Sequence, residues 1–259
     1  MKVVLLAGGF GTRISEESLT KPKPMIEIGS QPILWHIMKS YSCYGFNEFI
    51  ICAGYKQNII KEYFCNYYLH RSNITFDFTN KNKIIIHNNK TEPWKVTVID
   101  TGLNTMTGGR IKRVKDFIGN ETFMMTYGDG LCDLNLGKLL EFHRSHGKLA
   151  TLTAIQPRGR FGSLEIQPDQ TISRFAEKRK EDGGWINGGF MVLEPQVIDY
   201  IDGDATTFEK QPLEQLSRES QLIAYYYDGF WQCMDTMRDK QLLEDLLAKG
   251  NAPWKVWED

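Results

Sequence analysis

The opening of the chain constrains its fold more than any other stretch. Residues 3–7 are "VVLLA", an apolar run without interruption, and they lead directly into Gly8 and Gly9. A short run with β-branched members and no alternation is typical of a strand buried on both faces of a parallel sheet. Because parallel strands must be joined by crossovers, we expect helices and strands to alternate in a doubly wound sheet.

The pattern further along supports an α/β fold: a Rossmann-like, mixed but mostly parallel sheet flanked by helices, with a β-rich portion in the second half. Residues 74–78 and 84–87 alternate instead, which predicts an antiparallel hairpin turning at "NKN". The predicted helices are residues 32–45, 57–68, 108–118, 134–143 and 237–247, with a short one beginning at Pro195. The other predicted strands are residues 48–53, 96–100, 122–126, 150–155, 162–166, 172–177, 185–193 and 222–227.

The composition is that of an ordinary globular protein. No repeat or linker divides the 259 residues, so we expect a single domain over residues 1–259. The formal net charge of −1 argues against a nucleic-acid partner. No segment approaches the ~20 apolar residues that cross a bilayer, so no membrane partner is expected. The five cysteines are odd in number and form no C-x-x-C motif, which favours a reducing cytoplasm.

A glycine-rich loop follows the first strand. Gly8, Gly9 and Gly11 allow the backbone to approach a phosphate chain and to turn its N–H groups toward it. Arg13 adds a planar guanidinium that can hold phosphate oxygens. The loop lacks the G-K-[ST] of a Walker A motif and the third glycine of a dinucleotide fingerprint. A plain tight turn is the alternative for a G-G-x-G sequence by itself.

Two lysines between prolines strengthen the hypothesis of an anion site. Pro22 and Pro24 stiffen the segment "KPKP" and are expected to keep Lys21 and Lys23 out of a helix. Two cations held in this way beside Arg13 predict a bound anion. Without the preceding loop, the segment would be interpreted as a solvated basic turn.

These motifs resemble those of the sugar-1-phosphate nucleotidyltransferases. The loop "GGFGTR" followed by "PKPM" is similar to the signature of that family. Further stretches resemble the branch of the family that uses CTP and glucose 1-phosphate. They are "PILWHIMKSY", "EPWKVTVIDTG", "MTGGRIKRV", "YGDG", "GRFG", "INGGF", "FWQCMDTMRDK" and "APWKVW", and they span almost the whole chain.

The resemblance implies a fold, a reaction and a set of ligands. Residues 1–130 of the nucleotidyltransferase fold would mainly bind the nucleotide, and residues 131–259 would complete the sheet and bind the sugar phosphate. The implied reaction converts CTP and α-D-glucose 1-phosphate into CDP-glucose and pyrophosphate, for deoxysugars of cell-surface polysaccharide such as the lipopolysaccharide O-antigen. The implied nucleotide-binding residues are Leu6, Ala7, Gly8, Gly9, Gly11, Thr12, Arg13, Lys23, Thr105, Gly109, Arg110 and Asp129.

Two aspartates are the expected metal ligands. Asp129 follows a predicted strand in "YGDG", and Asp235 lies near the start of the last predicted helix in "WQCMDT". Each alone could be a turn residue or a helix N-cap. Mg²⁺ takes one or two carboxylates together with substrate phosphates, and the resemblance assigns it to this pair. The expected catalytic residues are Lys23, Arg13 and Asp129, which act by positioning and charge neutralisation, with no side-chain nucleophile.

Further residues are expected to bind the base of the nucleotide and the sugar phosphate. The resemblance implies that Thr105 and Arg110 contact the cytidine nucleotide, and small residues such as Gly109 at the start of a helix let a flat base approach. An N-cap and a surface arginine are the alternatives. In place of the proline that follows the E-K pair in the wider family, this chain has Arg179, which bears on the shape of that turn. The expected sugar-phosphate ligands are Tyr127, Gly128, Glu177, Lys178, Asn187 and Gly188.

Other functions stay open at this point. The nearest is a nucleotidyltransferase that uses UTP, dTTP or another acceptor. A non-catalytic nucleotide sensor would lack one of the metal or lysine positions, and all are present. We expect a homo-oligomer, and the tryptophans of "EPWKV" and "PWKVW" can mark subunit contacts, although core packing is the better explanation for any one of them. His36, on an apolar helix, is expected to be a core or surface residue.

Overall fold

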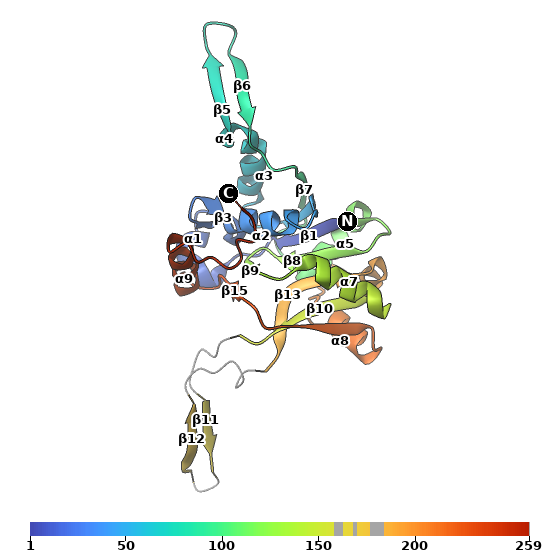
Figure 1. The fold of residues 1–259 in the computed structure, drawn as a ribbon. Coiled ribbons are helices and arrows are strands. Elements are labelled where there is room, and N and C mark those ends of the chain that lie inside the picture. The colour runs from blue at the N-terminus through green and yellow to red at the C-terminus, as the bar shows by residue number, and fades with distance from the viewer. Residues whose placement is uncertain (158–162, 168–169, 177–183, 259) are drawn as a thin grey trace.

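The computed structural model describes residues 1–157, 163–167, 170–176 and 184–258. Its centre is a seven-stranded sheet in the order β14-β10-β13-β8-β1-β4-β7 (Figure 1). β13 is antiparallel to both of its neighbours, and the other pairs of this sheet are parallel. The predicted mixed, mostly parallel sheet is confirmed. The strands are β1 (Lys2–Ala7), β4 (Glu48–Ala53), β7 (Lys95–Asp100), β8 (Phe123–Tyr127), β10 (Ala150–Ile155), β13 (Ile186–Leu193) and β14 (Leu222–Tyr227).

Helices cover both faces of this sheet and bury two apolar clusters. Along β1, Val3 and Leu5 belong to one cluster and Val4 and Leu6 to the other, which is why the strand is apolar throughout. Residues of α2, α3, α7 and α9 complete the first cluster, and residues of α5, α6 and α8 the second. The helices are α1 (Ser15–Ser18), α2 (Ile33–Ser42), α3 (Gln57–Cys65), α4 (Tyr67–His70), α5 (Thr107–Arg113), α6 (Lys115–Ile118), α7 (Leu136–His146), α8 (Gln211–Arg218) and α9 (Met237–Ala248).

Some helical predictions differ from the structure in their extent. The expected helix 57–68 is interrupted at Asn66, where the backbone leaves the helical conformation. The side chain of Asn66 donates to the carbonyl of Glu62 at 3.0 Å. The expected helix 108–118 is likewise divided at Val114. The short helix from Pro195 is a 3₁₀ helix, η4 (Pro195–Tyr200). Within the described residues, no helix is both long enough and apolar enough to cross a membrane.

The prediction that the prolines keep both lysines out of a helix is wrong for Lys23. Lys23–Met25 form one turn of 3₁₀ helix, η2, which follows Pro22 in extended conformation. Pro24 is its second residue, where a missing N–H costs little because the first N–H groups of a helix have no partner within it. The prolines therefore start a helical turn here rather than exclude one, and Lys23 is the first residue of that turn.

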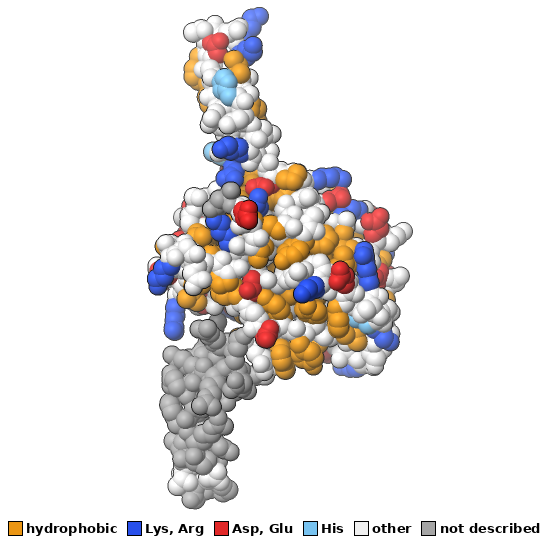
Figure 2. Space-filling model, viewed as in Figure 1, with side chains coloured by type: hydrophobic (Ala, Val, Ile, Leu, Met, Phe, Trp, Pro, Cys, Tyr) orange, Lys and Arg blue, Asp and Glu red, His pale blue; other side chains and the backbone are white. Residues whose placement is uncertain are grey.

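A two-stranded hairpin extends away from the body of the molecule, beyond α3 and α4 (Figure 1). It consists of β5 (Ser72–Asp77) and β6 (Lys83–Asn89), which confirms the predicted antiparallel pair. Lys81 and Asn82 make its turn with positive φ. Figure 2 shows apolar side chains along this arm. A second short pair, β11 (Ser163–Ile166) and β12 (Ile172–Ala176), is also antiparallel.

Residues 249–258 fold back onto α2. Trp254 is fully buried, and its Nε1 donates to Nδ1 of His36 at 3.4 Å. The other ring nitrogen of His36, Nε2, donates to the carbonyl of Ile28 at 2.9 Å. The rings of Trp35 and Trp257 also contact His36. His36 is therefore a core histidine, and Trp254, the first tryptophan of "PWKVW", is a core residue.

Candidate active site

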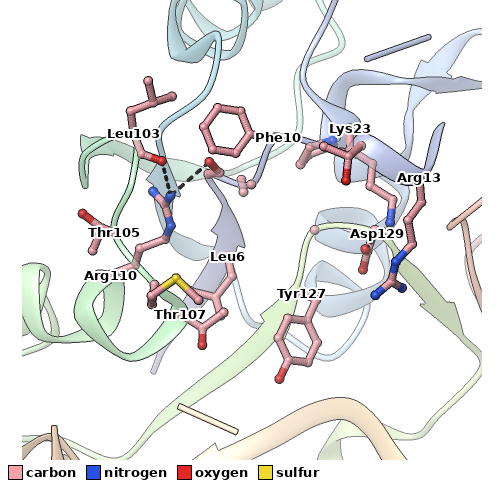
Figure 3. Close-up of a pocket in the computed structure, with 18 of the residues that line it drawn as sticks. Leu6, Phe10, Arg13, Lys23, Leu103, Thr105, Thr107, Arg110, Tyr127 and Asp129 are labelled. Atoms are coloured by element: carbon pink, nitrogen blue, oxygen red, sulfur yellow. Dashed lines mark hydrogen bonds and ion pairs between the residues drawn. The ribbon is translucent and has the colours of Figure 1, made fainter. Parts of the chain in front are cut away.

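A cavity of about 650 Å³ opens where β1 and β8 end. Ligands of open α/β sheets bind beyond the carboxyl ends of their strands, which is where this cavity lies. Figure 3 shows Arg110 and Thr105 toward one end of it and Lys23, Arg13 and Asp129 toward the other. The predicted site residues that line it are Leu6, Ala7, Gly8, Gly9, Gly11, Thr12, Arg13, Lys23, Thr105, Arg110, Tyr127, Gly128, Asp129 and Asp235.

Close packing fixes the backbone of the glycine-rich loop. Gly11 has a φ of 67°, in the left-handed region that favours glycine, and a Cβ there would lie 3.1 Å from Cβ of Ser18. The hydroxyl of Ser18 donates to the carbonyl of Gly11 at 3.0 Å. The chain then enters a 3₁₀ turn, η1 (Thr12–Ile14), from which Arg13 extends with 75% of its side chain exposed. Ser18 thus holds the loop at Gly11, while the side chain of Arg13 stays accessible to a ligand.

Arg110 is buried, which excludes the surface arginine considered as an alternative. Its guanidinium joins the glycine-rich loop to the ends of β4 and β7, as Figure 3 shows for two of these bonds. A Cβ at Gly8 would lie 2.0 Å from Nη1 of Arg110, so only glycine leaves room for it. Burial lowers the pKa of Arg110. The acceptors are the carbonyls of Gly8 (3.1 Å), Ala53 (3.3 Å), Gly102 (2.8 Å) and Leu103 (3.3 Å) and the hydroxyl of Thr101 (2.8 Å).

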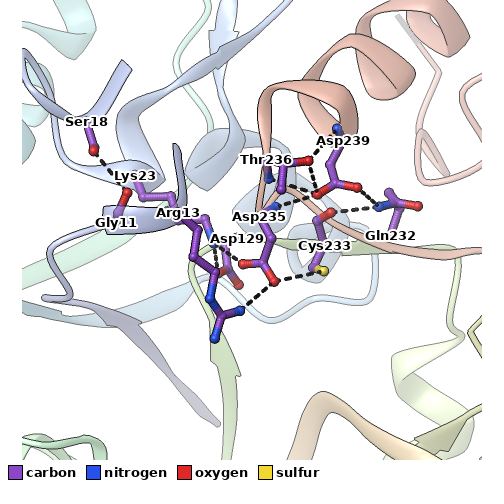
Figure 4. Close-up of polar contacts among 10 residues, drawn as sticks. All are labelled: Gly11, Arg13, Ser18, Lys23, Asp129, Gln232, Cys233, Asp235, Thr236 and Asp239. Atoms are coloured by element: carbon purple, nitrogen blue, oxygen red, sulfur yellow. Dashed lines mark hydrogen bonds and ion pairs between the residues drawn. The ribbon is translucent and has the colours of Figure 1, made fainter. Parts of the chain in front are cut away.

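Lys23 lies between the two aspartates that the sequence singled out (Figure 4). Its Nζ donates to Oδ2 of Asp129 and to Oδ1 of Asp235, both at 2.6 Å. Nη1 of Arg13 donates to Oδ2 of Asp235 at 2.9 Å. The structure therefore brings Arg13, Lys23 and two acids from distant parts of the chain to one point of the cavity, whereas Lys21 does not line it and pairs with Glu27 at 3.1 Å.

A small sheet places Asp235 beside Asp129. β9 (Gly130–Cys132) pairs with β15 (Trp231–Cys233), so that Gly130 lies opposite Cys233. The N–H of Met234 donates to the carbonyl of Asp129 at 2.8 Å and extends this pairing. Directly after Asp235, Thr236 caps α9, and the carboxylate of Asp239 accepts from the N–H groups of both. Asp235 is thus fixed from both sides and is not itself the N-cap.

The charges of this cluster support one another. Burial lowers the pKa of Lys23 and is the largest influence on it, but Asp129 and Asp235 together outweigh it and raise the pKa above its usual value. Burial likewise raises the pKa of Asp235, and Lys23 and Arg13 outweigh it and hold that pKa below its usual value. Lys23 and Asp235 are therefore both charged at neutral pH.

The two carboxylates fit a hard divalent cation. One oxygen of Asp129 and one of Asp235 lie 2.6 Å from the same Lys23 nitrogen, so both face a common point. Among the described residues, no group of three or more His, Cys, Asp and Glu could hold a metal. A pair of carboxylates is what Mg²⁺ uses when phosphates and water complete its coordination. An ion at this point would therefore depend on its substrate for the remaining ligands.

The end of the cavity near Arg110 has an apolar wall that sequence reasoning missed. Phe10, Leu103 and Met106 line the cavity with 44%, 50% and 44% of their surface exposed. Thr105 lies among them and is buried. Single apolar residues in loops give little signal in a sequence, although Phe10 is an aromatic residue inside the glycine-rich loop. The other lining residues that were not predicted are Pro24, Asn104 and Thr107.

The remaining predicted residues lie beside the cavity or outside the described residues. Gly109 packs against the backbone of Asp204, where a Cβ would lie 2.6 Å from its Cα. Asn187 does not line the cavity; its Nδ2 donates to the hydroxyl of Tyr127 at 3.4 Å. The carbonyl of Gly188 accepts from Nε1 of Trp231 at 2.7 Å. Glu177 and Lys178, with Arg179 after them, fall outside the residues that the structure describes.

Comparison with known proteins identifies the family. Residues 2–259 match the family model described as nucleotidyl transferase, so the chain belongs to that family. It is 57% identical, over the full length of both chains, to the glucose-1-phosphate cytidylyltransferase of Salmonella typhi. The resemblance found in the sequence is therefore confirmed.

Solved structures agree on the fold. HddC from Yersinia pseudotuberculosis is 25% identical with a TM-score of 0.66, over 95% of this chain and 99% of that one. A UDP-glucose pyrophosphorylase solved with UDP-glucose has a TM-score of 0.68 at 16% identity, over 96% of this chain and 98% of that one. The nucleotidyltransferase fold expected from the sequence is confirmed.

Proposed function

We propose that this protein transfers the cytidylyl group of CTP to α-D-glucose 1-phosphate and releases pyrophosphate, which gives CDP-glucose. The relative from Salmonella typhi, a glucose-1-phosphate cytidylyltransferase, supports this substrate pair through its 57% identity over the whole chain. The single structural observation that carries the proposal is the meeting of Lys23, Asp129 and Asp235 in the cavity under the glycine-rich loop. A triphosphate is the ligand that suits a loop of this kind with cations beside it.

The apolar end of the cavity is the proposed place of the base. The apolar side chains of Leu103 and Met106 can pack against the flat face of a nucleobase, and Phe10 lies at the same end (Figure 3). Thr105 provides a hydroxyl that can bond to an edge of the base. Arg110 acts here mainly by holding the loop, since its donors are directed at carbonyls of the protein. The triphosphate then extends along the loop toward Lys23.

The proposed reaction is an in-line substitution at the α-phosphorus. A phosphate oxygen of glucose 1-phosphate forms the new bond to this phosphorus, and the bond to the oxygen bridging to the β-phosphate breaks. Lys23 neutralises charge on the α-phosphate, and Arg13 holds the β- and γ-phosphates as pyrophosphate departs. No proton has to move to a side chain, so positioning and charge neutralisation are sufficient.

Asp129 and Asp235 are the proposed ligands of Mg²⁺. When bound there, Mg²⁺ neutralises phosphate charge and orients the two phosphates that react. Lys23 now donates to both carboxylates at 2.6 Å, so its Nζ must turn toward the substrate when these oxygens take up a cation. Tyr127, Gly128, Asn187 and Gly188, with Glu177 and Lys178, remain the proposed residues of the sugar-phosphate side.

A panel of nucleotides tests this function. Purified protein with Mg²⁺ and glucose 1-phosphate is given CTP, UTP, dTTP, ATP or GTP, and pyrophosphate release is measured. We expect turnover with CTP alone. Equal turnover with UTP or dTTP would overturn the base assignment, and no turnover with any nucleotide and several sugar phosphates would favour a nucleotide sensor. Removal of divalent ions with a chelator is expected to stop turnover, and added Mg²⁺ to restore it.

The cellular setting follows from the same proposal. CDP-glucose is an activated sugar, and enzymes that make deoxysugars for cell-surface polysaccharides consume activated sugars of this kind. The odd number of cysteines and the absence of a C-x-x-C motif support a cytoplasmic enzyme. Cell fractionation that finds the activity with the membranes or outside the cytoplasm would contradict this assignment.

We also propose that the chain forms a homo-oligomer through the β5–β6 hairpin. Ile84, Ile85 and Ile86 are 48%, 38% and 45% exposed, and successive side chains of a strand point to opposite faces. Both faces are therefore apolar, and an isolated two-stranded hairpin is only marginally stable in water. A second copy of the same arm offers a matching apolar surface.

Light scattering after size exclusion tests the assembly. We expect a mass that is a multiple of 29.9 kDa, and a shift toward the monomer when Ile84 and Ile86 are both changed to Asp. Lys81→Asp, at the tip of the hairpin, is the matched charge control. A wild-type mass of 29.9 kDa would refute the oligomer.

A further inference from the structure

Glu209 lies just outside the cavity and contacts two residues that line it. The hydroxyl of Tyr127 donates to Oε1 of Glu209, and the hydroxyl of Thr107 donates to Oε2, each at 2.5 Å. Thr107 begins α5 and Tyr127 ends β8. Figure 3 shows both side chains along the same margin of the cavity, with Leu6 between them. One carboxylate therefore joins two separate segments of the cavity wall.

We propose that Glu209 is a positioning residue that sets the spacing between the base end and the reacting end of the cavity. Thr107 directly follows Met106 on the apolar wall, and Tyr127 stands two residues before Asp129. A carboxylate that accepts one strong hydrogen bond at each oxygen holds its two donors at a fixed separation. This inference rests on the proposed function for the reaction that it affects.

The segment that carries Glu209 is firmly anchored. Phe208, its neighbour, is fully buried, and its N–H donates to the hydroxyl of Thr107 at 2.9 Å. The carbonyl of Thr206 accepts from the N–H of Gly108 at 2.9 Å. The same carbonyl accepts from the N–H of Gly109 at 3.3 Å, so it satisfies two of the first donors of α5, which a helix leaves without partners. Because the backbone directly before Glu209 is held in place, the carboxylate is a fixed support for the two hydroxyls.

Tyr127 is held equally closely on its other side. Its ring packs against Gly189, where a Cβ would lie 2.6 Å from Cδ2 of the ring. The side chain of Asn187 donates to the Tyr127 hydroxyl at 3.4 Å and accepts from the N–H of Gly189 at 2.8 Å. Burial and the nearby charge of Glu209 raise the pKa of Tyr127, so its hydroxyl keeps the proton that it donates. Asn187 thus acts on the cavity through Tyr127.

Loss of the carboxylate releases both segments. In Glu209→Ala the two hydroxyls lose their acceptor, and the substrate atoms that must meet are no longer held at one distance. Misplacement of reacting groups by about 1 Å costs about 10²-fold in rate, so we expect kcat to fall about 10- to 100-fold. The glycine-rich loop, which is proposed to hold the nucleotide, and Arg110, which holds the loop, keep their own contacts. The affinity for CTP alone is therefore expected to change by less than a factor of about three.

Steady-state kinetics and direct binding test this split. Wild type, Glu209→Ala and Glu209→Gln are compared, with Glu214→Ala on α8 as the matched control, because its carboxylate accepts from Arg218 one turn away and not from the cavity wall. Pyrophosphate release gives kcat and KM, and calorimetry with CTP and Mg²⁺ gives the affinity without the second substrate. We expect the Gln variant to be intermediate, because an amide offers one acceptor oxygen. Wild-type kcat in Glu209→Ala would overturn the proposal, as would equal losses of kcat and CTP affinity.

A double-mutant cycle identifies the path of the effect. If Tyr127 is positioned through Glu209, adding Tyr127→Phe to Glu209→Ala costs little beyond Glu209→Ala alone. Fully additive losses would show that the two residues act independently and would overturn the proposal.

Hydrogen exchange keeps the inference testable if the proposed reaction fails. Without wild-type turnover on any nucleotide, the proposed function is lost, but the support by Glu209 can still be measured. We expect the amides of Gly108 and Phe208 to exchange faster in Glu209→Ala than in Glu214→Ala. Equal exchange in both variants would overturn the support, whether or not the wild type is active.

Discussion

The pH dependence of folding depends on His36. Burial, with a smaller contribution from Lys255, lowers the pKa of His36 from 6.5 to about 4, although its bond to the carbonyl of Ile28 acts in the opposite direction. Its Nδ1 accepts from the N–H of Trp254, and a protonated ring would place a second donor against that N–H. The folded protein therefore keeps the neutral ring through the whole range in which a free histidine takes up a proton.

The sign and size of the effect follow from this difference. Below pH 6.5 His36 takes up a proton in the unfolded chain, but in the folded chain it does so only near pH 4. The contribution of the neutral ring to the free energy of unfolding is therefore fully present above pH 6.5 and is lost as the pH falls. The full difference corresponds to about 3 kcal/mol, of which about 2 kcal/mol is lost by pH 5. His36→Gln keeps one donor and one acceptor but no titrating group. We expect this variant to have a lower free energy of unfolding than the wild type at pH 7.5. Between pH 7.5 and pH 5 its free energy of unfolding should fall by about 2 kcal/mol less than that of the wild type.

Urea unfolding at a series of pH values measures this difference. Tryptophan fluorescence is a suitable signal because Trp35, Trp254 and Trp257 surround the histidine. Other groups, including the carboxylates, titrate in both proteins, so the difference between wild type and His36→Gln isolates the ring. Parallel stability curves for the two proteins from pH 7.5 to pH 5 would refute the reasoning.

Two substitutions test the site itself. Asp129→Asn is expected to reduce turnover by at least about 10²- to 10³-fold with little change in Tm, since Lys23 keeps its bond to Asp235; normal pyrophosphate release would remove Asp129 from the metal site. Gly8→Ala is expected to displace the guanidinium of Arg110 and to destabilise the fold by about 1–3 kcal/mol. Gly9→Ala is the control, because nothing lies within 4 Å of a Cβ there, and equal Tm values for the two alanine variants would contradict the packing argument.

The strands were predictable because their segments are short runs of apolar, β-branched and aromatic residues. The predicted strands 48–53, 150–155 and 222–227 agree with β4, β10 and β14 residue for residue. The direction of β13 was not predictable, because an apolar run buried on both faces has the same composition in either direction. α8 was missed because Pro212 and its polar neighbours obscure the narrow apolar face that it buries.

The site shows a similar limit. The loop, Lys23, Asp129 and Asp235 stand in motifs that resemble a family, and the structure brings them together at one cavity. Glu209 stands in no motif, and its importance comes from contacts with residues 82 and 102 positions away in the chain. Arg110 was expected at the base, but its partners are carbonyls whose positions depend on three separate segments. Such pairings are set by the tertiary fold rather than by local sequence.

The packing of Trp254 against α2 has a consequence for folding during translation. The indole lies against a histidine 218 positions earlier, and Asp235 joins the site from the same late part of the chain. A nascent polypeptide on the ribosome can form β1 and α2 early, but it cannot close this layer or assemble its charged centre until residues 235–254 have been translated. Until then the apolar surface of α2 is open to chaperones, and a stalled or truncated chain would be recognised as unfinished.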